Sequence, residues 1–350
     1  MSNKRNSGIE LLRLLSMYYI VFYHLIIHVL NGLNPHSLVF AISETILHIG
    51  VICFVLITGY FGIRPSLKGF LRFFLICLTY NVFVYLTSVL WGINVFSNSE
   101  FLRSFFAISK TNLWFVNCYA ALYIVSPLIN KILAKSNLRE KLIFTFLLGI
   151  LCFYLGWLMK NDIFWGGKNL INFVFLYFIG NLISKISPRF YKVKTSLLIL
   201  IYVLYNTIIV VSYIILSEYK QIVKYFFFPY DSPGLILNGC LCFFIFIKIG
   251  VNFRSKIINK LAVSAFAVYL LHENTYINWF IYRKLSHFDN PELNDIQTIF
   301  VFGLIAFLIF VVCIAIDQIL APIMLPIHRF IIDKFELICQ KLKLQPKQSN

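Results

Sequence analysis

Charge is scarce in this sequence, and acidic charge is the scarcest. Only 13% of the 350 residues are charged, against about 25% in soluble domains, and Lys and Arg outnumber Asp and Glu by 31 to 14. The mean hydropathy of +0.81 excludes an ordinary water-soluble globular protein. The net charge of +17 does not indicate nucleic-acid binding, because the basic residues lie between apolar runs and form no single patch. The composition therefore predicts a membrane protein.

The sequence also lacks a cysteine framework and a motif for a metal. No pair of cysteines has the spacing of zinc ligands, and Cys240 and Cys242 would point to different sides of a helix. No small-residue cleavage site follows the basic start MSNKR, so the first apolar run is expected to be a retained span. We expect the eight cysteines to be packing residues, at Cys53, Cys77, Cys118, Cys152, Cys240, Cys242, Cys313 and Cys339.

What the sequence has in abundance is apolar runs of bilayer length. Ten runs of about 17–26 residues predict an all-α, polytopic membrane protein. The predicted spans cover approximately 8–30, 42–63, 69–91, 113–133, 141–159, 169–186, 195–216, 233–250, 261–282 and 296–321. Apolar residues at helical spacing, with lysines between them, follow the last span. We therefore expect a transmembrane domain over residues 1–325 and a basic amphipathic cytoplasmic tail over residues 326–350.

The distribution of basic residues predicts the orientation of these spans. With the N-terminus inside, 22 basic residues fall in inside segments and eight in outside segments, with Arg13 lying within the first span. Such an asymmetry, alternating through all the loops, is the positive-inside pattern. The sequence therefore predicts both termini in the cytoplasm and a multi-pass protein of the cell membrane (inner or plasma membrane).

Two ionisable residues share one face of the first predicted span. Arg13 and His24 are eleven residues apart, which is three helical turns plus roughly 20°, and about 16 Å along the axis. Ionisable groups within a bilayer are costly unless they are paired or line a polar cavity. The pair therefore indicates either a functional site or a packing arrangement in which Arg13 reaches the headgroups and a neighbouring helix satisfies His24.

Further polar residues lie within or at the edges of the predicted spans. Glu10 is three residues before Arg13, so an ion pair along the helix would reduce the cost of burial. Glu44 and His48 are four residues apart, share a face and could hydrogen-bond or line an entrance.

His272 falls near mid-membrane in the predicted ninth span, at a depth similar to that of His24. The two could reach one cavity, where a neutral imidazole suits a general base; a core histidine bonded to a backbone carbonyl is the other reading of His272. No metal is expected, since no carboxylate or thiol cluster accompanies the histidines at ligand spacing.

On the predicted cytoplasmic side, the loop GIRPSLKGFLR places Arg64, Lys68 and Arg72 at four-residue intervals. Three cations at a helix entry suit a phosphate-rich ligand, although ordinary positive-inside topology explains them as well.

Four ordered blocks give the sequence a family resemblance. It resembles the membrane acyltransferase type 3 family, the integral-membrane O-acyltransferases, and Thr58 stands where that family's FF-x-x-SGY pattern has Ser. The blocks are Arg13-x10-His24, GVICFVLITGYF (residues 50–61), LWFVNCYAALYIVSPLIN (residues 113–130) and AVYLLHE (residues 267–273).

The resemblance implies transfer of an acyl group, usually acetyl, from cytoplasmic acyl-CoA to a sugar hydroxyl. It implies that His24 is catalytic, that Arg13 carries the role of the family's matching Arg, and that acetyl-CoA is the co-substrate. The family's R-x-x-R motif is only approximated by Lys68-x3-Arg72, which leaves their role at the CoA phosphates open. The implied partners are a saccharide or lipid-linked saccharide and, since some relatives need a separate partner, polysaccharide-assembly proteins.

The spacing of the polar residues and the family resemblance together predict one catalytic mechanism. Acyl-CoA would bind near Arg13, with its thioester arm extending toward His24 over the roughly 16 Å between them. His24 would act as a general base or carry the acyl group itself, and His272 or Asn117 would stabilise the oxyanion. A transporter or flippase for lipid-linked saccharides is the main rival, and a polysaccharide polymerase is a weaker one. The former predicts an inverted repeat and the latter an arginine-bearing long external loop, neither of which the sequence shows.

Overall fold

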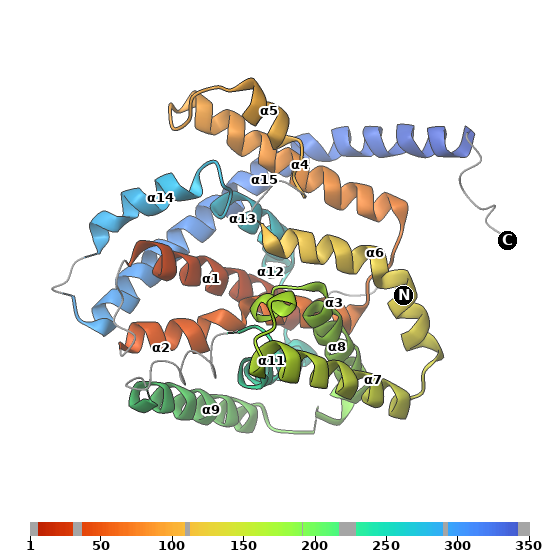
Figure 1. Cartoon of the computed structure of the whole chain (residues 1–350), viewed down its shortest axis with the longest axis vertical. Coiled ribbons are helices and arrows are strands. Elements are labelled where there is room, and N and C mark those ends of the chain that lie inside the picture. Colours follow the sequence, from red (N-terminus) through yellow and green to blue (C-terminus); the bar gives the residue numbers. More distant parts are fainter. Residues whose placement is uncertain are drawn as a thin grey trace.

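The computed structural model describes residues 6–30, 37–108, 113–190, 192–216, 229–289 and 293–341. Within these ranges the chain is helical and contains no strand (Figure 1). The elements are α1 (Ser7–Val29), α2 (Leu38–Thr45), η1 (Leu47–Ile49), α3 (Gly50–Phe61), α4 (Leu67–Leu90), α5 (Asn98–Ser104), α6 (Trp114–Lys135), α7 (Leu138–Ile150), the π-helix η2 (Leu151–Leu158), η3 (Asp162–Gly167), α8 (Leu170–Phe190), α9 (Thr195–Leu216), α11 (Pro233–Asn252), α12 (Lys256–Leu261), η4 (Ala262–Ser264), α13 (Ala265–His272), α14 (Asn278–Leu285), η5 (Ser286–Phe288) and α15 (Asp295–Lys341).

Nine of the ten predicted spans correspond to a helical segment long and apolar enough to cross a membrane within the described residues. The second of these, Leu38–Phe61, is assembled from α2, η1 and α3. The all-α, multi-pass fold is therefore confirmed. The orientation with both termini inside stays a prediction.

The predicted span at 261–282 differs, because it is divided among α12, η4, α13 and α14. The side chain of Asn274 accounts for the main break. Its Nδ2 donates to the Leu270 carbonyl at 3.4 Å, and its Oδ1 accepts from the Tyr276 backbone N–H at 3.1 Å. An amide that bonds nearby backbone competes with the helix, so α13 ends at His272 and Glu273 becomes its cap residue.

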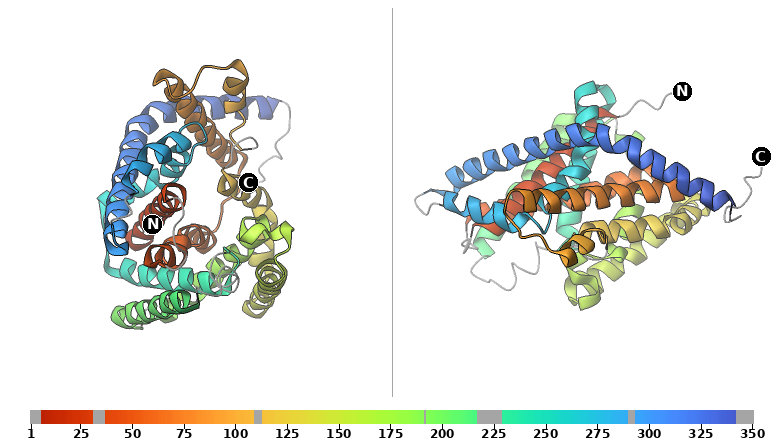
Figure 2. Two further views of the ribbon diagram at one scale, coloured as in Figure 1. Left: turned by 60° about the vertical axis from the view of Figure 1, so that its left-hand side comes forward. Right: turned by 90° about the horizontal axis from the view of Figure 1, so that it is seen from above.

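Helix α1 forms the centre of the molecule. It contacts α3, α11, α13 and α15, and Figure 2 (left) shows it enclosed by later helices. Over half of its membrane span is buried, against 17% of the span in α9, whose apolar side chains face outward. An apolar outer face suits lipid contact, so α1 is an inner helix and α9 a peripheral one.

The segment Thr58-Gly59-Tyr60 fixes how closely α3 approaches α8. A Cβ on Gly59 would collide with the backbone of Tyr177, and one on Gly180 would collide with the backbone at Leu56. Small residues on facing membrane helices allow such close approach. The glycine of this predicted family block therefore has a packing role.

Helix α15 runs without interruption from Asp295 to Lys341, with Pro322 and Pro326 inside it. Figure 2 (left) shows it turn from the side of the molecule to cross beside α4, as expected of a helix that contains proline. The predicted boundary between residues 325 and 326 falls within this helix. Residues 342–350 of the predicted tail lie outside the described residues.

Candidate active site

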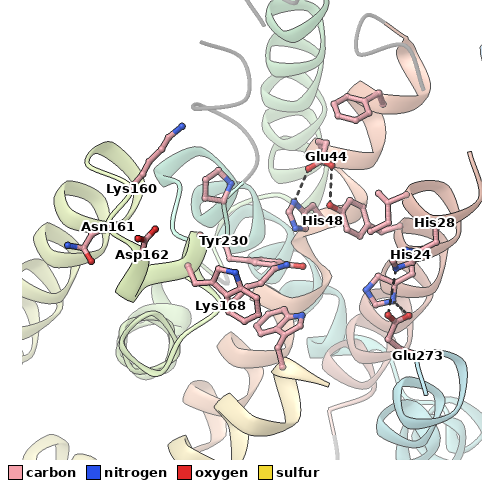
Figure 3. Close-up of a pocket in the computed structure, with 18 of the residues that line it drawn as sticks. His24, His28, Glu44, His48, Lys160, Asn161, Asp162, Lys168, Tyr230 and Glu273 are labelled. Carbon is pink, nitrogen blue, oxygen red and sulfur yellow. Dashed lines mark hydrogen bonds and ion pairs between the residues drawn. The ribbon is translucent and has the colours of Figure 1, made fainter. Parts of the chain in front are cut away.

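Polar side chains from four parts of the chain surround a cavity of about 1010 Å³, which we call the His24 cavity. His24 and His28 come from α1, Glu44 and His48 from α2 and η1, and Glu273 from the end of α13. Figure 3 shows His24 and Glu273 on one wall, with Lys168 on the other. The cavity is further lined by Tyr23, Trp114, Asp162, Trp165 and Tyr230.

His24, His272 and Glu273 form a connected cluster on the first wall. His24 Nδ1 lies 3.1 Å from His272 Nε2 and 3.1 Å from Glu273 Oε2. Tyr282 of α14 donates to the same carboxylate at 2.7 Å, and His28 Nε2 lies 3.7 Å from Glu273 Oε1. The break between α13 and α14 thus places the Glu273 carboxylate beside both histidines of α1, His24 and His28.

These contacts assign the tautomer of His24. His272 Nδ1 lies 2.7 Å from the Val268 carbonyl, which can only accept, so this nitrogen carries the hydrogen and Nε2 of the neutral ring is an acceptor. His24 Nδ1 therefore faces two acceptors, Nε2 of His272 and the carboxylate of Glu273, and must be the donor. The lone pair of neutral His24 is then on Nε2, to which no described residue hydrogen-bonds.

The same three residues have the composition of a catalytic zinc site. One ligand atom from each lies within 4.8 Å of the others. The spacing within the sequence did not indicate this cluster, because Glu273 was not paired with the histidines. However, Nδ1 of His24 carries a proton in the hydrogen-bond pattern above, and a metal would have to displace it.

A second carboxylate–histidine pair lies deeper on the wall formed by α2 and η1. Tyr23 donates to Glu44 Oε1 at 3.1 Å, and Glu44 Oε2 lies 3.2 Å from His48 Nδ1 without hydrogen-bond alignment. The His48 ring stacks on Tyr23 at 4.5 Å and meets the edge of Tyr230 at 4.2 Å. The predicted contact between Glu44 and His48 is therefore present, and both line the His24 cavity.

Arg13 lines a separate cavity of about 300 Å³, the Arg13 cavity, together with Thr58, Tyr119 and apolar side chains. A void of about 20 Å³ lies between the two cavities: it shares His24 and Trp114 with one and Phe115 with the other. Arg13, Met17, Ile20 and His24 line these three spaces in turn. Steps of four, three and four residues keep them on one face of α1.

A family model described as an acyltransferase domain (Acyl_transf_3) matches residues 6–317. The chain belongs to the acyltransferase 3 family. No curated protein and no solved structure matches it. The matched residues include both cavities and all four sequence blocks, so the predicted family is confirmed. With the nine apolar helices found among the described residues, the chain is a membrane acyltransferase.

The structure separates the other predicted site residues of this acyltransferase into two groups. Arg13 donates to Glu10 at 2.9 Å, as the sequence predicted, and still lines its cavity. Lys68 instead forms exposed ion pairs with Asp333 and Glu336 of α15, at 3.5 and 3.4 Å. Exposed residues that line neither the His24 nor the Arg13 cavity are Arg72 and Asn117.

Sequence reasoning missed two contributors to the His24 cavity. Glu273 is the last residue of the block AVYLLHE and directly follows His272, but no spacing in the sequence indicates that it contacts His24. Nothing in the sequence singles out Lys168, because it is one of eight basic residues in the predicted outside segments. Its place beside the cavity depends on a turn that only the folded chain shows.

Proposed function

We propose that this acyltransferase is an O-acyltransferase, in the first instance an O-acetyltransferase. It would move an acyl group from cytoplasmic acyl-CoA to a hydroxyl of a cell-surface saccharide or its lipid-linked precursor, at the cell membrane. The observation that carries the proposal is His24, whose Nδ1 is held as a donor by Glu273 and His272 at 3.1 Å each. This arrangement leaves the lone pair of Nε2 free to act as a base, and His24 lines the larger cavity.

The proposed step uses these groups as follows. Nε2 of His24 takes the proton of the acceptor hydroxyl while its oxygen attacks the thioester carbonyl. The carbon–sulfur bond breaks, and the CoA thiolate leaves with the proton from the imidazolium. Glu273 offsets the positive charge that His24 carries in between, and His272 holds the ring in place. Transfer through an acyl-histidine would begin at the same nitrogen.

The donor would enter through the Arg13 cavity, with Arg13 toward its phosphate groups. Lys68 and Arg72 as further phosphate ligands stay a prediction. The void between the cavities, about 20 Å³, has room for roughly one water molecule, so its aromatic walls must move apart to admit the thioester arm. Phe54, Phe115 and Phe266 line both the void and the Arg13 cavity, which makes them the side chains that would turn.

The test is acyl transfer by the purified chain in lipid nanodiscs, from labelled acetyl-CoA to isolated surface saccharide. His24→Gln is expected to lower the rate by roughly 10²–10⁴, the contribution of a positioned base. We assign the step no metal ion, so a chelator should leave the wild-type rate unchanged.

The matched control is His287→Gln, an exposed histidine of η5 that lines neither cavity. It should retain the wild-type rate. Full activity of a correctly folded His24→Gln protein would remove His24 from the mechanism, and a chelator-sensitive rate restored by zinc would make the cluster a metal site.

A further inference from the structure

A strained turn builds the wall of the His24 cavity opposite His24. Trp165, Gly166 and Gly167 have successive φ angles of +40°, +60° and +81°. Positive φ suits glycine but is unfavourable for a bulky residue such as tryptophan. The turn persists because the backbone N–H of Tyr230 donates to the Gly166 carbonyl at 2.9 Å, and Asn172 donates to that of Gly167 at 3.0 Å. Strain held in this way is a feature of functional sites.

This turn presents Lys168 to the cavity between two indole rings. The ammonium lies 5.6 Å from the ring centroid of Trp114 and 5.4 Å from that of Trp165, and all three residues line the cavity. Lys168 is labelled in Figure 3. Its backbone N–H donates to the carbonyl of Trp165 at 3.2 Å, which keeps the lysine at the end of the turn. Burial lowers the pKa of Lys168, and the charge of Glu44 partly opposes this.

The lysine has no counter-ion of its own. Over the described ranges, no carboxylate forms an ion pair with its ammonium. Of the carboxylates that line the cavity, Glu44 contacts Tyr23 and His48, and Glu273 contacts His24. The third, Asp162, is exposed and forms no ion pair with Lys168. A partly desolvated cation without an anion is unfavourable unless a ligand supplies one.

We propose that Lys168 and its two flanking indoles bind an anionic group of the acceptor, either a sugar carboxylate or the phosphate of a lipid carrier. The acceptor then carries a negative charge, either on the saccharide itself or on the lipid carrier to which it is attached. This inference rests on the proposed function in one respect, that the His24 cavity receives the acceptor. An anion at Lys168 and the reacting hydroxyl at His24 would hold the saccharide across the cavity from wall to wall.

Binding of defined probes without any acyl-CoA tests the inference. The probes are methyl glucuronide, glucose 1-phosphate and the neutral methyl glucoside, and tryptophan fluorescence reports binding because Trp114 and Trp165 flank the ammonium. The wild-type protein should bind at least one acidic probe roughly 10- to 150-fold more tightly than the neutral one, as expected for a charge-assisted hydrogen bond. Preference for the glucuronide identifies a sugar carboxylate, and preference for the phosphate identifies the carrier.

Lys168→Gln should abolish the preference, and Lys168→Arg should retain most of it with the same fold. Lys284→Gln is the matched control, since Lys284 also lies over an aromatic ring, Phe280 at 5.6 Å, but outside the cavity. The control should keep the preference. Equal affinity of the wild type for acidic and neutral probes, or a preference that survives Lys168→Gln, overturns the inference.

The two proposals fail separately. A protein that transfers acetyl groups but binds neutral and acidic probes alike keeps its O-acyltransferase function and loses the assignment of Lys168. If the protein prefers the acidic probe but shows no acyl transfer under any condition, the anion site at Lys168 is supported and the proposed reaction is contradicted.

Discussion

The His24 cavity and the Arg13 cavity lie along one face of α1 but differ in the number and kind of charged side chains that line them. The His24 cavity is lined by three carboxylates, Glu44, Asp162 and Glu273, of which Glu44 and Glu273 contact histidines and tyrosines. Among the described residues, none forms an ion pair with Lys168, which lines the same cavity. In the Arg13 cavity the single charged lining residue is Arg13, already bonded to Glu10. Groups able to move protons are thus gathered in one cavity, while the other has one cation, which would have to leave Glu10 in order to bind a phosphate.

The largest effect is expected from removing the charge of Glu273 beside His24. Glu273→Gln keeps the shape of the side chain but cannot offset an imidazolium, so the rate of acyl transfer should fall roughly 10- to 150-fold, the worth of a charged hydrogen bond. Glu100→Gln, a partly exposed carboxylate of α5 that lines neither cavity, is the control. Equal rates for Glu273→Gln and wild type would show that the two cavities do not differ as described.

A smaller effect is expected at the other cavity. Arg13→Gln should raise the KM for acetyl-CoA by about tenfold and change kcat less, since the lost contact is to the donor and not to the reacting atoms. It also leaves the buried Glu10 without its partner, which lowers thermal stability.

The double variant Glu10→Gln/Arg13→Gln separates these two effects. Its melting temperature should recover, because no unpaired carboxylate is left, while the raised KM should persist. A KM that recovers together with stability would make Arg13 a packing residue.

The smallest expected effect concerns a carboxyl behind the Lys168 wall. Asp231 is fully buried, neither of its carboxylate oxygens has a hydrogen-bond partner, and burial raises its pKa to about 7. The folded chain therefore keeps a proton that the unfolded chain releases at about pH 4, and the stability this provides is lost as the pH rises through 7.

Asp231→Asn cannot ionise, so its melting temperature should exceed that of the wild type at pH 8 and by much less at pH 5. Asp289→Asn, an exposed position, should show no such pH dependence. A difference between Asp231→Asn and wild type that is the same at both pH values would contradict the assignment.

Much of this molecule could be predicted from periodicity, because apolar runs of bilayer length leave few alternatives to membrane helices. The Arg13–His24 spacing likewise predicted a shared face, since helix geometry alone fixes it. The division of 261–282 could not be seen, because apolar residues continue past Asn274 and the break depends on where one amide finds its hydrogen bonds. The roles of Glu273 and Lys168 depend on which helices meet, which is a property of packing and not of any single segment.

The number of residues between Arg13 and His24 also fixes which side chains of α1 face the two cavities. One residue inserted between Arg13 and His24 would turn the histidine by about 100° and carry its ring off the line that faces Glu273. Loops elsewhere in the chain can change length at little cost. An inserted residue between Arg13 and His24 should therefore disturb the contact between His24 and Glu273 far more than one inserted in an exposed loop.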